Sequence, residues 1–262
     1  MKKLTHLQEQ IVKLLLYNPG DAFNIIRKTT NPGYTTRYLN SLIPYRIGVE
    51  IDAAGYTRKV HNQIREFHRN NGLHDYLVDY GDDIDKGSAN EIRISCSNLR
   101  HYKNFFKALQ ILNNEERITL DSRGGLHIHV SLTDCMRVRG VNENEVSETA
   151  FIENLYKIEN WERKIDKYFF YLNNTVAKSK YAPKHTKRQD GRVGTTKDHV
   201  ALHSGAAIIV LRNKISIEYR IMQPTFDYTA IMRSALVFQQ MNKSLIHNTP
   251  FNKELCDNFL RL

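Results

Sequence analysis

The chain has 262 residues, of which 41% are hydrophobic and 25% are charged, enough apolar material for one large domain with a sizeable core. Its formal net charge of +10 predicts anionic partners, namely nucleotide phosphates, nucleic acid or an acidic substrate. Three distant cysteines, Cys96, Cys135 and Cys256, indicate neither a disulfide framework nor a structural zinc site.

The first forty residues predict an appended helical segment. An amphipathic helix is expected over 4–16, ending at the Asn18-Pro19-Gly20 turn, and a shorter helix over 21–27. Polar and charged residues interrupt the apolar run of the first helix, which is typical neither of a signal peptide nor of a membrane span. We therefore expect a cytoplasmic protein without a membrane segment, with residues 41–262 folded as a single domain.

Two strands with alternating polar and apolar residues follow. In the first, over 45–52, Glu50 and Asp52 fall on the face opposite the apolar residues. Two carboxylates placed two residues apart on a strand can bridge a hard cation such as Mg²⁺. In the second strand, over 90–95, Glu91 and Arg93 share the polar face. Helices are expected over 57–70 and over 98–113.

The segment GGLHIHVSL, residues 124–132, combines glycines, histidines and the alternation of a strand. Leu126, Ile128 and Val130 would pack on one face, and His127 and His129 would project from the other. Two imidazoles on one sheet face can hold a divalent metal or a phosphate. The preceding glycines allow a ligand to approach the backbone closely.

A long amphipathic helix is expected over 147–175, with its aromatic residues in the core. It is followed by a basic segment, residues 178–192, that includes Lys178 and Arg188. This segment has no regular period and is read either as a solvated loop or as a loop that faces phosphates.

Two further strands, over 206–212 and 215–222, are joined by a tight turn. In the second, Glu218 and Arg220 share a face, opposite a face that includes Tyr219 and Ile221. A helix over 227–245 closes the domain.

Four strands thus repeat one design, with an apolar face for a helical layer and a polar face rich in Glu, Asp, His and Arg. A sheet face that is merely exposed to solvent would be expected to contain many Thr, Ser, Lys and Gln residues. Acidic and imidazole groups that converge on a concave surface would bind divalent cations, and a neighbouring arginine would bind phosphate oxygens.

These stretches resemble a known family. GGLHIHVSL is similar to the glycine-histidine segment of glutamine synthetase, GVEID to its first carboxylate strand, and SIEYRI to its late Glu-x-Arg strand. Their order along a short chain is closer still to the predicted amidoligases, relatives within the carboxylate-amine ligase group that includes glutamate-cysteine ligase. The resemblance covers roughly residues 45–245 and rests on about four short stretches. It implies an α+β fold in which a curved antiparallel sheet has helices on its convex side.

The resemblance also implies cofactors and residue roles. The cofactors are ATP with Mg²⁺ or Mn²⁺, bound by residues 41–262 as a single catalytic domain. Two metal sites are implied, one held by Glu50, Asp52 and Glu91 and the other by His127 and Glu218. His129 would bind an ATP phosphate and Arg220 the transferring phosphoryl group, and Lys178 and Arg188 would lie on a loop that closes over the phosphates.

The implied reaction is ATP-dependent amide bond formation between a carboxylate and an amine, through an acyl phosphate. Three departures from the family pattern are present. On the second strand only Glu91 is clear, with Asp85 as a possible helper. Asp52 stands where the family has the longer Glu. The family's ammonia-site elements have no counterpart, which implies an amine other than ammonia or an inactive relative.

Two alternatives start from other features. His129-Val130-Ser131 matches half of a metal-independent two-histidine phosphoesterase, but His203-Ser204 and His199 do not supply the second half. The net charge, with Tyr181 among basic residues, is the basis for a nucleic-acid-binding protein. That alternative leaves the row of carboxylates unexplained, because carboxylates repel a phosphate backbone.

Overall fold

A computed structural model gives the fold as α+β, a class that the sequence predicts. The structure describes residues 6–28, 43–44, 46–55, 57–70, 79–80, 90–96, 101–120, 125–132, 168, 195–196, 199–203, 206–211 and 214–262.

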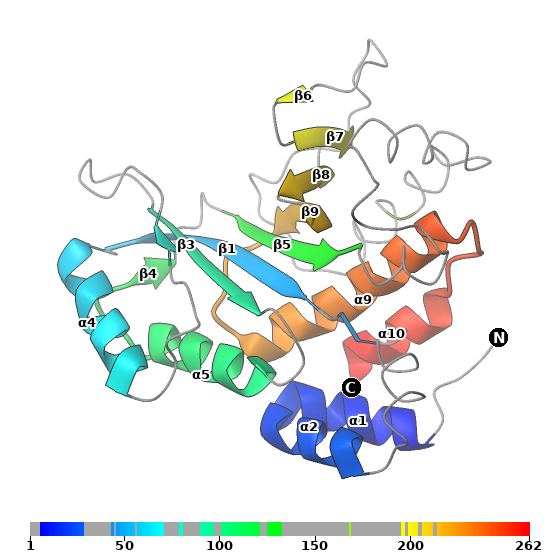
Figure 1. Ribbon diagram of the computed structural model, residues 1–262, viewed down its shortest axis with the longest axis horizontal. Coiled ribbons are helices and arrows are strands. Elements are labelled where there is room, and N and C mark those ends of the chain that lie inside the picture. Colours follow the sequence, from blue (N-terminus) through cyan, green and yellow to red (C-terminus); the bar gives the residue numbers. More distant parts are fainter. Residues whose placement is uncertain are drawn as a thin grey trace.

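An antiparallel sheet forms the centre of the described chain (Figure 1). Its nine strands are β1 (Ile47–Ala54), β2 (Asp79–Tyr80), β3 (Asn90–Cys96), β4 (Thr119–Leu120), β5 (Leu126–Ser131), β6 (Thr195–Thr196), β7 (His199–His203), β8 (Ala206–Leu211) and β9 (Lys214–Met222). The order across the sheet is β2-β3-β1-β5-β9-β8-β7-β6, and β4 pairs with β1. The four strands expected to carry the polar residues are therefore adjacent, in the order β3-β1-β5-β9.

Helices lie on one side of β3, β1 and β5 (Figure 1). The described helices are α1 (His6–Tyr17), α2 (Pro19–Lys28), α4 (Arg58–Asn70), α5 (Tyr102–Asn113), α9 (Tyr228–Ile246) and α10 (Lys253–Arg261). None of them combines the length and the apolar character that a bilayer crossing requires.

Strand β1 shows why one face of the sheet meets helices. Ile47, Val49 and Ile51 are buried, whereas Glu50 and Asp52 between them are only partly buried. The buried residues of β1 pack with residues of α5 and α9 in the core. Burying the apolar face of the strand under helices removes it from water, which is favourable. The polar face is thereby left for chemistry.

Helix α9 is the central support of the sheet. Its N-terminus is capped by Asp227, whose carboxylate accepts hydrogen bonds from the backbone N–H groups of Thr229 and Ala230 at 2.8 and 3.3 Å. The N-terminal helices also pack into this core, and the hydroxyl of Tyr228 donates to the carbonyl of Leu15 at 2.9 Å.

Strand β9 contains an irregularity that alternation does not predict. Leu126 pairs with Met222, and Ile128 pairs with Tyr219, so two residues of β9, Arg220 and Ile221, oppose the single residue His127. Two residues on one strand opposite one residue on its partner define a β-bulge. The sequence pattern predicts Ile221 on the face of Tyr219, but the extra residue brings Met222 to the buried face.

Other expected elements differ in their bounds or were missed. Strands β8 and β9 pair as predicted, with Leu211 opposite Lys214, and residue 213 of the predicted turn lies outside the described residues. Strand β7 and helix α10 were not predicted. Strand β7 is short, whereas α10 has apolar residues at helical spacing, Leu255, Cys256, Phe259 and Leu260, that the prediction did not use. The expected helix over 147–175 lies outside the described residues except for Tyr168, which is helical and buried.

We predict that Gly55→Ala destabilises the protein by about 1–3 kcal/mol. Gly55 ends β1 with φ +77°, and a Cβ there would lie 2.0 Å from the carbonyl oxygen of Arg117. Urea unfolding measures the change. Gly20→Ala is the control, because a Cβ there meets only the flexible Lys103 side chain, and equal destabilisation of both variants would contradict the prediction.

Candidate functional site

Strand pairing brings charged side chains together on the sheet face opposite the helices. Glu50 of β1 is directly opposite His127 of β5, and His129 is directly opposite Glu218 of β9. Directly paired residues of antiparallel strands project from the same face with Cβ atoms about 4.5–5.5 Å apart. The three central strands thus place two carboxylates around two imidazoles.

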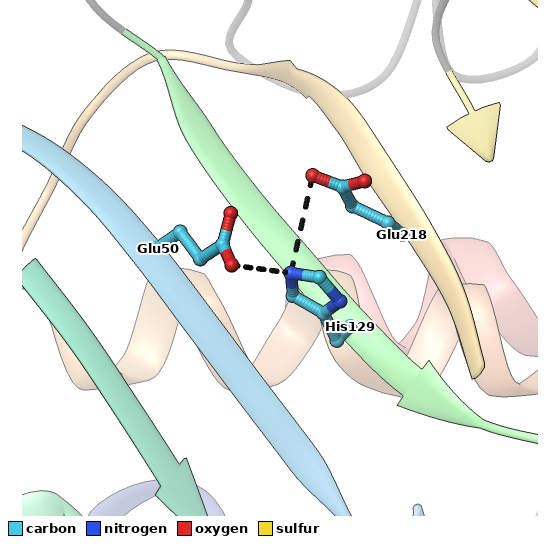
Figure 2. A group of neighbouring side chains, drawn as sticks. All are labelled: Glu50, His129 and Glu218. Atoms are coloured by element: carbon cyan, nitrogen blue, oxygen red, sulfur yellow. Dashed lines mark ion pairs between the residues drawn. The ribbon is translucent and has the colours of Figure 1, made fainter. Parts of the chain in front are cut away.

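Glu50, His129 and Glu218 point toward one another (Figure 2). The Nε2 atom of His129 lies 3.3 Å from Glu50 Oε1 and 3.9 Å from Glu218 Oε1. One ligand atom from each of the three residues lies within 4.8 Å of the others. Nε2 of His129 is also buried without a hydrogen-bond partner among the described residues. Such orphaned polar atoms are rare in native structures and call for an explanation.

His127 contacts the same two carboxylates. Its Nδ1 atom lies 3.2 Å from Glu50 Oε2 and 3.1 Å from Glu218 Oε1. Burial of the ring opposes its charged form, but hydrogen bonds to Glu218 and Glu50 outweigh burial and raise the pKa of His127 to about 9. A proton on His127 therefore balances part of the negative charge at neutral pH.

Glu218 is the most enclosed of the charged groups, since its side chain is 0% exposed. Burial by itself would raise the pKa of this carboxyl, yet the contacts with His127 and Arg220 hold the pKa below its usual value. Arg220 contributes a hydrogen bond of 2.7 Å from Nη2 to Glu218 Oε2. Glu218 is therefore an anion in the folded protein near neutral pH.

Two arginines flank the cluster on opposite sides. Arg93 of β3 lies 3.4 Å from Glu50, and its side chain is 46% exposed. Arg220 of β9 is 38% exposed, and its Nε atom is buried without a hydrogen-bond partner in the described part of the chain. The guanidinium of Arg220 can therefore hold Glu218 through Nη2 while its Nε donor remains for an anion.

Asp52, a predicted metal ligand, has another partner. Its Oδ2 atom accepts a hydrogen bond of 2.7 Å from the N–H of Gly125, and its own N–H donates to the Gly125 carbonyl at 3.1 Å. Asp52 is not among the three grouped ligand residues. Glu91, another predicted ligand, is opposite Asp52 in the register, and its side chain lies outside the described residues.

The remaining candidates are not brought to the cluster by the described residues. Lys178 and Arg188 lie outside them. His199 and His203 belong to β7, which is separated from β5 by β9 and β8. At about 4.8 Å per strand, β7 lies about 14 Å from β5, so these histidines do not pair with His129 across adjacent strands as a second half-site.

The donor set at the centre suits a divalent cation. Two carboxylates and an imidazole are ligand types that bind Mg²⁺, Mn²⁺ or Zn²⁺. The 3.3 and 3.9 Å separations from His129 Nε2 resemble the spacing of neighbouring ligands around such an ion, about 3 Å for ligands 2.1 Å from an octahedral metal. The family resemblance implies a phosphate contact for His129, whereas the geometry groups it with the carboxylates.

We predict that His127 titrates near pH 9 in protein freed of divalent cations by chelation. A pKa raised from 6.5 to about 9 on folding gives stabilisation that is complete below pH 6.5, declines as the pH rises, and is absent above 9. Imidazole NMR signals against pH measure the titration. In Glu218→Gln the midpoint should fall toward 6.5, and an unchanged midpoint would show that Glu218 does not set it.

Comparisons with known proteins add no assignment: no protein-family model and no curated protein matches the chain. The resemblance to the carboxylate-amine ligases therefore rests on the short motifs alone. Any function must be argued from the geometry of the cluster.

Proposed function

We propose that the protein is an ATP-dependent carboxylate-amine ligase with a glutamine synthetase-like catalytic fold. The observation that carries the proposal is the convergence of Glu50, His129 and Glu218 from three adjacent strands. A phosphoryl-transfer site needs fixed groups that bind cations beside groups that bind phosphate. The cluster offers the first in its carboxylates and imidazole, and the second in its flanking arginines.

The donor chemistry supports Mg²⁺ or Mn²⁺ as the metal. Glu50, His129 and Glu218 would hold the ion, and His129 Nε2, which has no hydrogen-bond partner among the described residues, would supply the nitrogen ligand. When bound, the ion would neutralise charge on the phosphate oxygens of ATP. Asp52 and Glu91 remain proposed metal ligands beside Glu50, and His127 one beside Glu218, although His127 would have to lose its proton to bind a metal.

Arg220 has the position to act on the transferring group. One edge of its guanidinium is fixed by Glu218 at 2.7 Å, so the side chain is oriented before any ligand arrives. Its buried Nε atom has a donor to spare. A guanidinium fixed in this way stabilises charge as it develops, without the cost of reorienting at the moment of reaction.

The proposed reaction has two steps. An oxygen of the substrate carboxylate attacks the γ-phosphorus of ATP, and ADP leaves, giving an acyl phosphate. The nitrogen of an amine then attacks the acyl carbon, phosphate leaves, and the nitrogen loses a proton. Both steps move negative charge between oxygens that the arginines can contact.

We predict that ATP and Mg²⁺ together raise the melting temperature of the protein more than either alone. A ligand that binds only the folded state stabilises it. The carboxylates of the cluster repel the phosphates of ATP, so ATP should bind well only together with its cation. A thermal-shift screen measures the effect. The absence of any response to the pair would reject the proposed cofactors.

We predict that Glu218→Gln lowers carboxylate- and amine-dependent ADP release by about 100-fold or more, since an electrostatic group at the reacting centre is lost. The assay mixes acidic substrates and amines with ATP and Mg²⁺. Glu116→Gln, at an exposed carboxylate outside the cluster, is the matched control. Undiminished turnover in Glu218→Gln would remove the proposal, and hydrolysis of a cyclic phosphodiester in chelator would favour a metal-independent phosphoesterase.

A further inference from the structure

Behind the cluster, on the helical side of the sheet, α9 places one amide against two site strands. Asn242 is fully buried, with 0% of the residue exposed. Its Oδ1 atom accepts a hydrogen bond of 2.7 Å from the hydroxyl of Tyr219, and its Nδ2 atom donates to the carbonyl of Val130 at 3.3 Å.

The two partners of Asn242 are neighbours of the cluster in sequence. Val130 follows His129 on β5, and Tyr219 follows Glu218 on β9. His129 and Glu218 are themselves directly paired across these strands. On the helical face of the sheet, the amide of Asn242 therefore links β5 to β9. On the opposite face, His129 and Glu218 face each other across the same two strands.

The orientation of the amide is fixed by chemistry. A backbone carbonyl only accepts, so the atom of Asn242 that faces Val130 must be the nitrogen. The oxygen is then left for the Tyr219 hydroxyl, which donates. Each end of the amide is satisfied by a different strand, which offsets the cost of a buried polar group in an apolar core.

We propose that Asn242 is a positioning residue that sets the separation of His129 and Glu218, an inference that rests on the proposed function of the cluster. Beside Tyr219, β9 carries the bulge at Arg220 and Ile221, where pairing with β5 shifts. A ladder is least constrained at such a bulge. An apolar contact tolerates a shift of the strands, whereas a two-ended hydrogen bond holds one register.

The Tyr219 ring has a separate anchor. It stacks on Phe238 of α9, with ring centroids 4.0 Å apart and an interplanar angle of 10°. Tyr219→Phe would keep this stacking and lose only the hydroxyl that binds Asn242. The variant therefore separates the hydrogen bond from the packing.

The experiment measures Mn²⁺ affinity by electron paramagnetic resonance in wild type, Tyr219→Phe and Asn242→Leu. Ser234→Ala is the matched control, because Ser234 is a buried polar residue of α9 whose hydroxyl donates only to its own helix, to Ala230 at 3.0 Å. The temperature is chosen so that circular dichroism shows every variant folded, and loss of global stability then leaves the affinity unchanged.

We expect Tyr219→Phe and Asn242→Leu, the two bridge variants, to bind Mn²⁺ about 10-fold or more weakly. Metal affinity falls by about this factor when groups that orient metal ligands are removed. Ser234→Ala should bind as wild type does. Wild-type affinity in Tyr219→Phe and Asn242→Leu with only a lower melting temperature would overturn the inference, as would an equal loss in Ser234→Ala.

A second readout separates this inference from the proposed function. If wild type fails to bind Mn²⁺, the ligase proposal fails, and the ring ¹⁵N shifts of His129 in metal-free protein decide the role of Asn242. Shifts that move in both bridge variants and stay constant in Ser234→Ala support positioning. Shifts that stay constant in all three variants overturn it.

Discussion

The central constraint on this structure is the repulsion between Glu50 and Glu218, whose carboxylates both contact the imidazoles of His127 and His129. Like charges about 4 Å apart repel by about 4 kcal/mol at an effective dielectric constant of 20. The chain offsets this repulsion with the proton of His127, which contacts both carboxylates. Arg93 and Arg220 add one ion pair to each carboxylate. Each carboxylate thus contacts two of the three cations, so removing one cation takes away one of two compensating contacts of a partly buried carboxylate.

Such a cluster requires a rigid support, and the middle of an antiparallel sheet supplies one. Strands β1, β5 and β9 each have a neighbour on both sides, so their side chains are fixed by ladders of hydrogen bonds rather than by loops. Helix α9 packs beneath β5 and adds a buried polar contact through Asn242. The same apolar alternation that builds the core on one face therefore fixes the charges on the other.

Alternation in the sequence predicted the strands and the face on which Glu50, His127, His129 and Glu218 lie, because the period of a strand is a local property. It did not predict the bulge opposite His127, the carboxylate contacts of His129, or the bond from Gly125 to Asp52. These features depend on which strands are neighbours and in what register, and no local pattern encodes that. Strand β7 was missed because its pattern is short, whereas α10 was missed although its apolar residues recur at helical spacing.

A network of ion pairs would need no ligand if all its buried polar atoms had partners. Among the described residues, Nε2 of His129 and Nε of Arg220 are cluster atoms without a hydrogen-bond partner. Their demands differ, since a neutral imidazole nitrogen can bind a cation and a guanidinium N–H can only donate to an acceptor such as an anion. A cation alone would satisfy the first, and an anion alone would satisfy the second. A metal ion that carries a phosphate satisfies both, which is why a nucleotide bound with its cation fits this cluster better than either ion alone.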